Sequence, residues 1–286
     1  METEEQLRAC IDAPELSLIY IDTGYFAPEM WREKAEAVRK SGKLCAARFP
    51  HIFRKEADRL FTENIEELSA FDAFLLRSFE ELGFIYERLH KEGRHIPPLI
   101  FDHSMYSFNL EALRAAAGLG ADTITLPLEL NMRELKYLCS KYRIYKEKKE
   151  AETKQAPGIE LTVYGRIPMM VTAQCVKKTK AGCDKKPCVL YLKDRKNELM
   201  PVKNCCSFCY NTVLNSKPTV IYDMKDEIEE LAPDFMRLEF TVEDYKDTAR
   251  IISEAAKIWS STGKDIEKRS GRAGDFTRGH FKRGVE

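Results

Sequence analysis

Short apolar runs recur along the first half of the chain, and each is followed by a stretch with helical spacing. Such runs are typical of strands buried on both faces, and the amphipathic stretches are typical of helices that cover a sheet. Five of these units, each roughly 25 residues long, predict a parallel sheet covered by helices. The expected strands are 16–22, 43–49, 71–78, 97–104 and 121–130, and the expected helices are 28–40, 53–68, 79–92, 109–118 and 133–140.

The second half continues the pattern less regularly. We expect strands at 159–165, 218–223 and 235–241, helices at 225–231 and 243–259, and a short extra strand at 142–145 in a charged loop. Seven or eight strands with intervening helices predict an α/β fold of the (β/α)8 TIM-barrel type, complete or distorted. It would span residues 1–265 and carry a cysteine-rich excursion, 165–211, near its C-terminal end. Residues 266–286 are glycine-rich and basic and predict an extended C-terminal arm.

The charges of the 286 residues balance, with 46 Lys and Arg against 46 Asp and Glu. No overall field therefore attracts nucleic acid or a membrane, and such binding has to come from a local patch. No apolar run approaches the ~20 residues of a membrane span, and the acidic first residues lack the apolar region of a signal peptide. We therefore expect a cytoplasmic chain without a membrane partner.

Six of the nine cysteines lie between Cys175 and Cys209. In a reducing compartment, clustered thiols favour a metal or an iron–sulfur cluster over disulfides. Cys206 and Cys209 form a C-x2-C step that suits two ligands on one turn, and two further ligands would return from the other side. The predicted metal ligands are Cys175, Cys183, Cys206 and Cys209.

Two other cysteines bear on this ligand set. Cys205 is an alternative to Cys206, because only one of two neighbouring residues is expected to face the site. Cys188 precedes the apolar run VLYL and suits the entry of a strand. A four-cysteine zinc site that only folds the excursion is the structural alternative to an iron–sulfur cluster.

Polar residues at the ends of the predicted strands are the other candidates, because the chemistry of such barrels lies at the C-terminal ends of the strands. Each of them could instead be a turn residue or a helix cap; Asp22 before Gly24 suits a turn, and Asn131 before MREL suits an N-cap. We select Asp102, Glu129 and Glu239 as catalytic candidates and Arg48, Arg77, His103, Asn131 and Arg166 as substrate-binding candidates.

Peptidase chemistry has little support among the residues. The sequence contains no HExxH and no GxSxG, and its five histidines are spread singly. Asp102 and His103 are the one adjacent carboxylate–histidine pair. Neighbours on an extended strand point to opposite faces, so they are not expected to act as a dyad.

The stretch ELTVYGRIPMMVTAQC (160–175) resembles the signature of the U32 peptidase family, the collagenase-like proteins. In that pattern a strand glutamate precedes a glycine by five residues and a cysteine follows the glycine by ten, as Glu160, Gly165 and Cys175 do here. Residues 102–112 and 126–135 resemble the family's fourth and fifth βα units, and RLEF (237–240) stands at its KIEGR-like strand. The chain departs from the pattern where Pro168 replaces the first cysteine, Ala173 a glycine, and Phe240 and Thr241 the Gly-Arg pair.

The resemblance implies a [4Fe-4S] protein that hydroxylates RNA bases, in tRNA or rRNA, or the ubiquinone ring, and it adds Glu160 to the catalytic candidates. The family's older name implies a collagenase-like protease instead. The endings CSFCYN and FTRGHFKRGVE resemble the C-terminal half of long, two-copy members, which implies an N-terminal U32 domain in the same or a partner chain. A non-catalytic half with a structural zinc site is the third alternative. Basic stretches at 177–180, 193–196 and 277–283 are candidate phosphate contacts.

Overall fold

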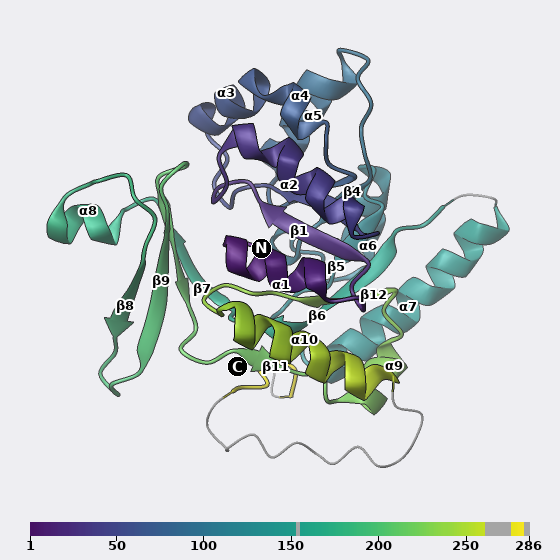
Figure 1. Ribbon diagram of the computed structural model, residues 1–286. Helices are drawn as coiled ribbons and strands as arrows, with labels where there is room; N and C mark the ends of the chain where they lie inside the picture. The colour runs from purple at the N-terminus through teal and green to yellow at the C-terminus, as the bar shows by residue number, and fades with distance from the viewer. Residues whose placement is uncertain (153–154, 261–275, 283–286) are drawn as a thin grey trace.

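The computed structural model describes residues 1–152, 155–260 and 276–282, which form a curved eight-stranded sheet and a separate four-stranded sheet (Figure 1). The strands of the curved sheet are β1 (Leu18–Asp22), β2 (Leu44–Arg48), β3 (Ala73–Leu76), β4 (Leu99–Phe101), β5 (Thr123–Thr125), β6 (Gly158–Gly165), β11 (Thr219–Val220) and β12 (Phe235–Leu238). Its α-helices are α1 (Glu4–Asp12), α2 (Pro28–Lys40), α3 (Lys55–Glu63), α4 (Ile65–Leu68), α5 (Phe79–Ile85), α6 (Leu110–Gly118), α7 (Met132–Ala151), α9 (Lys225–Leu231) and α10 (Tyr245–Ser260). A π-helix at Tyr86–His90 extends α5, and a 3-10 turn at His103–Met105 follows β4.

The strand order confirms the expected TIM-barrel-like α/β fold in a distorted form. β1 to β6 lie side by side in chain order and all pair in parallel. β12 adds a seventh parallel strand beside β6, and the short β11 pairs antiparallel with the end of β6. Within the described residues β1 and β12 are not paired with each other, so the barrel wall stays open along the line between them. We call this line the seam.

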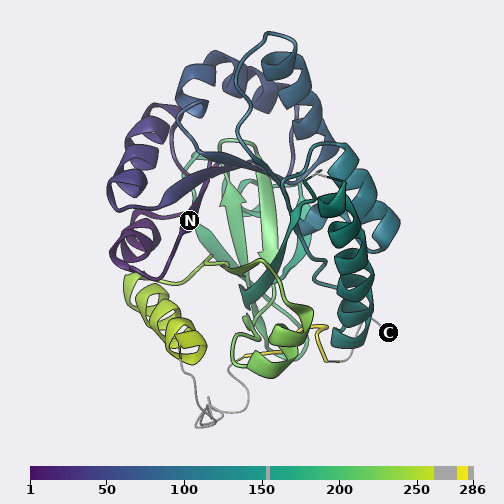
Figure 2. The same cartoon turned by 90° about the vertical axis from the view of Figure 1, so that its right-hand side faces the viewer.

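Helices cover the outer face of the curved sheet, as Figure 2 shows. The largest core lies between the sheet and these helices, and a small second core lies inside the curve, around Ala46, Ala73, Leu75 and Ile100. α2 illustrates how the sequence sets this layer. Its buried residues Trp31, Ala35 and Val38 recur at helical spacing, and Pro28 occupies its first turn, where a missing N–H costs nothing.

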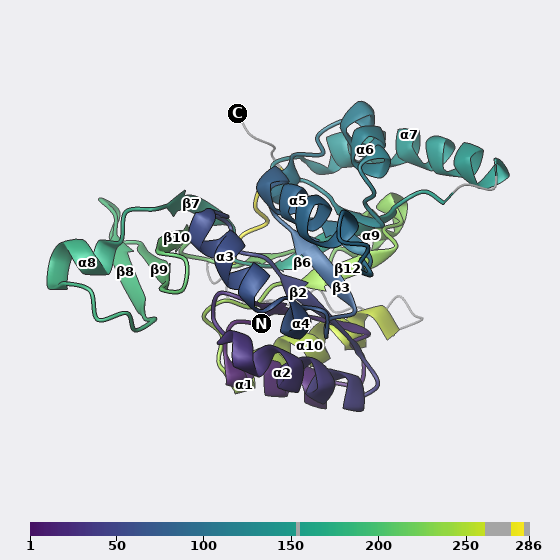
Figure 3. The same ribbon diagram turned by 90° about the horizontal axis from the view of Figure 1, so that it is seen from above.

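The cysteine-rich excursion forms the four-stranded antiparallel sheet, in the order β7-β10-β9-β8. Figures 1 and 3 show it projecting from the barrel as a separate layer. We call residues 165–214 the cysteine module; its elements are β7 (Pro168–Thr172), α8 (Val176–Ala181), β8 (Val189–Lys193), β9 (Leu199–Cys205) and β10 (Tyr210–Leu214).

Two sequence expectations about helices were incomplete or wrong. The helix expected at 133–140 continues as α7 to Ala151, so the strand expected at 142–145 is absent from the described chain. Leu135, Leu138 and Tyr142 are buried along one face of α7, and this apolar stripe keeps the charged segment helical. The N-terminal helix α1, which the sequence pattern did not predict, is capped by Thr3, whose side chain accepts a hydrogen bond from the Gln6 N–H.

The described part of the predicted C-terminal arm, residues 276–282, packs on the barrel. Thr277 bridges to Thr219, Arg278 forms an ion pair with Asp223, and Phe281 is buried. The rest of that arm, 266–275 and 283–286, lies outside the described residues. A search of the described helices found none that is long and apolar enough to cross a membrane.

Candidate functional site

Six buried, oppositely charged side chains meet inside the barrel at the carboxyl ends of its strands. We call them the charged ring: Asp22, Arg48, Arg77, Asp102, Arg237 and Glu239. Arg77 Nη2 lies 3.3 Å from Asp22 Oδ2, and Arg77 Nε lies 3.5 Å from Asp102 Oδ2. Positive and negative groups therefore alternate from β1 across to β4.

The remaining ion pairs connect Asp102 back to Asp22. Arg237 Nη2 lies 2.5 Å from Asp102 Oδ1 and 3.9 Å from Glu239 Oε2. Arg48 contacts Glu239 directly, and its Nε lies 3.7 Å from Asp22 Oδ2. Each charge thus has an opposite charge on both sides, which offsets much of the cost of taking these groups out of water.

The carboxyl groups of the ring do not all have the same acidity. Burial raises the pKa of Asp22 and outweighs the opposing effect of Arg48. Burial would also raise the pKa values of Asp102 and Glu239, but neighbouring arginines more than offset its effect. The largest opposing influence is Arg237 for Asp102 and Arg48 for Glu239. Both pKa values are lowered. Environments that push carboxyl pKa values apart assign them to different roles, and here Asp22 is the group best suited to hold a proton.

Glu160, on β6, contacts the ring through Arg237. Its Oε2 lies 3.2 Å from Arg237 Nη1 and accepts a hydrogen bond from Thr125 Oγ1. Its Oε1 accepts a 2.6 Å hydrogen bond from the Tyr20 hydroxyl. Both carboxylate oxygens are therefore engaged.

The cysteine module covers the mouth of the ring. Ser207 Oγ donates to the Gly24 carbonyl at 3.0 Å, and Cys205 Sγ lies 3.6 Å from the same oxygen. The His51 N–H donates to the Tyr210 hydroxyl at 3.3 Å. A hollow of about 300 Å³ remains between the two layers, lined by side chains that include Asp22, Arg48, His51, Arg77, Lys203, Tyr210 and Glu239.

Five of the nine barrel residues predicted from the sequence come together in and beside this ring: Arg48, Arg77, Asp102, Glu160 and Glu239. His103 lies next to it, and its backbone N–H donates to Asp102 Oδ1 at 2.9 Å. Asn131 caps α7 instead, in a reciprocal capping box with Glu134. Glu129 belongs to the loop after β5, and its buried Oε2 has no hydrogen-bond partner among the described residues.

Arg237 is not among the residues predicted from strand-end position. It lies two residues before Glu239, and residues two apart on a strand share a face, so the alternation in RLEF could have placed it inside the barrel. Asp22 was noted as a strand-end residue, and the ring gives it a charged partner on each side.

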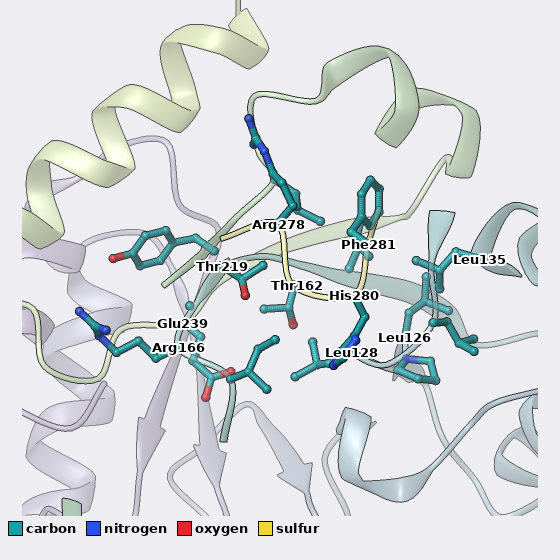
Figure 4. Close-up of a pocket in the computed structure, with 18 of the residues that line it drawn as sticks. Leu126, Leu128, Leu135, Thr162, Arg166, Thr219, Glu239, Arg278, His280 and Phe281 are labelled. Atoms are coloured by element: carbon teal, nitrogen blue, oxygen red, sulfur yellow. The ribbon is translucent and has the colours of Figure 1, made fainter. Parts of the chain in front are cut away.

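Arg166 lies outside the ring, in a second hollow of about 540 Å³ at the ends of β5 and β6 (Figure 4). Its guanidinium donates to the carbonyls of Asn215 and Ser216. The C-terminal segment closes one side of this hollow with His280 and Phe281, and leucines line much of the remainder. Arg166 thus holds the two ends of the cysteine module together.

Within the module, the thiol of Cys206 lies near enough to three other thiols to be influenced by their charge. Burial raises the pKa of Cys206, and the neighbouring thiols of Cys175, Cys183 and Cys188 add to the rise. Cys188 is a member of this group that the sequence analysis had assigned to strand entry. β8 does begin at Val189, so Cys188 lies both at the entry of this strand and near Cys206.

Two buried asparagines hold the segments that carry these cysteines. Asn204 accepts a 2.6 Å hydrogen bond from the Cys188 N–H, and its side-chain amide lies 3.2 Å from Cys206 Sγ. Asn211 accepts a hydrogen bond from the Val176 N–H, beside Cys175. The Lys178 N–H, then the Asn211 amide, lower the pKa of Cys175 and favour its thiolate.

The other two cysteines of the module point elsewhere or lie at its surface. Cys205 is buried against Gly24, and burial, followed by the charge of Asp22, raises the pKa of its thiol to about 12. Cys209 is exposed, with its Sγ 3.9 Å from the Cys206 carbonyl oxygen. No three His, Cys, Asp or Glu side chains in the described ranges are already arranged to hold a metal ion. The predicted ligand set therefore stays a prediction.

No family model matches the chain, and no curated protein matches it. Among solved structures it is similar to a putative fructose-1,6-biphosphate aldolase from Coccidioides immitis, at 15% identity and a TM-score of 0.39 over 56% of this chain and 61% of that one. It is also similar to the Bacillus cereus spore cortex-lytic enzyme SleL, at 10% identity and a TM-score of 0.39 over 88% and 71% of the two chains.

A third similar structure is 2,3-dimethylmalate lyase, a member of the PEP mutase/isocitrate lyase superfamily. The identity is 13% and the TM-score 0.32, over 94% of this chain and 70% of the lyase. This chain spans less than two thirds of the aldolase. The assignment of a TIM-barrel-like fold therefore rests on the strand order described above.

Proposed function

We propose that this chain is an iron–sulfur protein of the U32 type that acts on RNA, in the hydroxylation of a base of tRNA or rRNA. The observation that carries the proposal is that the side chain of Asn204 contacts both the Cys188 backbone N–H and Cys206 Sγ, while Cys175 and Cys183 lie near enough to raise the pKa of Cys206. Thiolates are the ligands that iron–sulfur clusters take, and four of them suffice.

The donor chemistry fits such a cluster, although the thiols would still have to move together. Cys183 lies in an exposed segment without regular structure, between α8 and β8, so this segment can move at little cost. Metal binding would then complete the fold of this edge of the module. A bound cluster would supply electron transfer, while the protein would hold the substrate and exclude water.

The charge of the module supports an anionic substrate. Residues 165–211 contain ten Lys and Arg against three Asp and Glu, in a chain whose net charge is zero. Tyr191 on β8 is 58% exposed, and Val189, Tyr191 and Lys193 project from the same face of that strand. Exposed aromatic rings beside lysines suit a single-stranded nucleic acid, because they combine base stacking with phosphate contacts.

The position of the cysteines supports a link to the charged ring. Cys205 faces Gly24 and the ring carboxylate Asp22, and Cys206 is the next residue along the chain. A centre held by Cys206 would therefore lie near the mouth of the ring. Asp22, with its raised pKa, would be a proton donor or acceptor beside it.

Anaerobic purification tests the proposal. The chain should be brown, absorb broadly at roughly 400 nm and contain about four irons and four sulfides. Cys206→Ser should remove the cluster, whereas Cys139→Ala, which changes a buried thiol on α7, should keep it. A colourless chain with one zinc would contradict the proposal and favour the structural site.

The fourth ligand can be decided by two further variants. If Cys188 is the ligand that its position beside Cys206 suggests, Cys188→Ser should lose iron while Cys209→Ser retains it. The reverse result would restore the set predicted from the sequence, in which Cys209 completes the C-x2-C step.

A further inference from the structure

A pocket opens in the seam, between the amino ends of β1 and β12, away from the cysteine module. It encloses about 1170 Å³, including the part open to solvent. We call it the seam pocket. Its walls are mainly apolar and include Leu16, Leu18, Phe235, Met236, Leu238 and Trp259. A mostly apolar pocket with a few polar groups at one end is the usual form of a small-molecule site.

Two of the charged residues that line the seam pocket, Glu160 and Arg237, are buried. Glu15 is exposed, and Asp234 already binds Lys146 and the Ile159 N–H. Arg237 is 5% exposed, and its two terminal nitrogens already pair, Nη1 with Glu160 and Nη2 with Asp102. Its Nε has no hydrogen-bond partner among the described residues. A buried N–H without a partner is costly, and an acceptor brought by a ligand would satisfy it.

The charges around Arg237 determine which acceptor fits. The guanidinium is within 4 Å of three carboxylates, those of Asp102, Glu160 and Glu239, so a fourth anion would be repelled. An ammonium group carries donors only, so it has no acceptor to offer to Arg237 Nε. A neutral carbonyl-type oxygen meets neither obstacle.

We propose that the seam pocket binds an elongated, neutral and mostly apolar small molecule that places a carbonyl-type oxygen on Arg237 Nε. The apolar body would lie along β1 and β12 and against Trp259. No residue of the cysteine module lines the seam pocket, and its occupation does not depend on the proposed cluster.

Intrinsic fluorescence can test the proposal, because the chain has two tryptophans and they differ in environment. Trp31 belongs to α2 and is fully buried, whereas Trp259 lines the seam pocket. The full chain is titrated with 2-decanone, decanoate and decylamine, each below its micelle concentration. We expect a saturable change with 2-decanone, at least about tenfold weaker binding of both charged analogues, and loss of the signal in Trp259→Phe. Equal binding of all three molecules, or no saturable change, would overturn the proposal.

Two variants on α10 provide a matched comparison. Ala256 lines the seam pocket, and Lys246 is exposed on the same helix. Ala256→Phe should fill the pocket and weaken 2-decanone binding by at least about tenfold, whereas Lys246→Phe should leave it unchanged. If both variants bind as the natural sequence does, or both lose binding to the same extent, the pocket is not the site.

Discussion

At the scale of single residues, we expect the charged ring to be the part of the molecule most sensitive to substitution. A buried ion pair adds little net stability when complete, but removing one partner leaves a charge buried without compensation. Arg77 illustrates this, because it is buried and separates Asp22 from Asp102. Without it, two carboxylates would face each other inside the barrel.

Arg77→Met should therefore lower the free energy of unfolding by about 3–5 kcal/mol. The matched control is Arg250→Met on the surface of α10, where Arg250 pairs with Asp247 and Glu254 in solvent. That change should cost about 0.5 kcal/mol or less. Equilibrium unfolding in urea measures both. Equal losses in the two variants would show that the ring pairs behave as surface pairs do.

His51 gives a pH dependence at the same scale. Burial, together with the positive charge of Arg48, lowers its pKa to about 4. The unfolded chain takes up this proton near pH 6.5, while the folded chain resists it down to about pH 4. Stability should therefore fall on acidification across this window, by at most about 1.4 kcal/mol per pH unit.

Urea unfolding at several pH values between 4 and 7 checks this. His51→Gln should flatten the profile, and His95→Gln, at an exposed position, should leave the slope as it was. A slope that survives in His51→Gln would assign the effect to other groups.

At the scale of elements, the main question is how the cysteine module is held on the barrel. The contact between the module and the loop after β1 leaves no room for a larger residue. A Cβ at Gly24 would lie 2.5 Å from Cys205 Sγ and 3.2 Å from the Phe208 ring. The stacking of Phe208 on Phe61 of α3, with ring centroids 6.0 Å apart, continues this contact.

Gly24→Ala should accordingly destabilise the chain by about 1–3 kcal/mol through overpacking. Adding Cys205→Ala should recover part of the loss, because the clashing sulfur is removed. Gly83→Ala is the control, since a Cβ there meets nothing within 4 Å in α5; it should be neutral or stabilise by up to about 1 kcal/mol. Thermal unfolding compares the three variants, and a failure of Cys205→Ala to rescue would place the clash elsewhere.

At the scale of the whole molecule, the net charge of zero is the sum of a basic module and an acidic remainder. The seven excess positive charges of residues 165–211 are matched by seven excess negative charges in the remainder of the chain. The module projects from the barrel, as Figure 3 shows, so a polyanion can approach it without meeting the acidic surface first.

RNA binding should then depend on the module and on salt. Changing Lys193, Arg195 and Lys196 together to Gln should make the slope of log K against log salt shallower by about 2. The same number of changes at exposed lysines of the barrel (Lys40, Lys55 and Lys148) should not alter it. Filter binding of a single-stranded tRNA fragment measures the slope, and equal slopes in both triple variants would argue against the module as the RNA surface.

The sequence by itself determined the elements and the fold class, because these depend on local periodicity. The bounds of α2 and α9 agree with the expected ranges, and the strands of the curved sheet lie within the predicted apolar runs, except that β6 begins one residue earlier. The four strands of the cysteine module were not predicted individually. Strand-end position also predicted most of the charged ring. The local pattern gave a wrong prediction at 142–145, where α7 continues and no strand forms. The buried residues of α7 pack on the rest of the fold, and this packing outweighs the polar composition of the segment.

Only the tertiary structure decided which residues meet. Arg237 pairs with Asp102, 135 residues earlier in the chain, because β12 adds to the sheet beside β6. Cys188 joins Cys206 because β8 and β9 pair antiparallel with a register that brings their ends together. The open seam between β1 and β12 is a property of the whole sheet and has no signal in either strand. Register and closure arise from contacts between distant segments, which periodicity along the chain does not record.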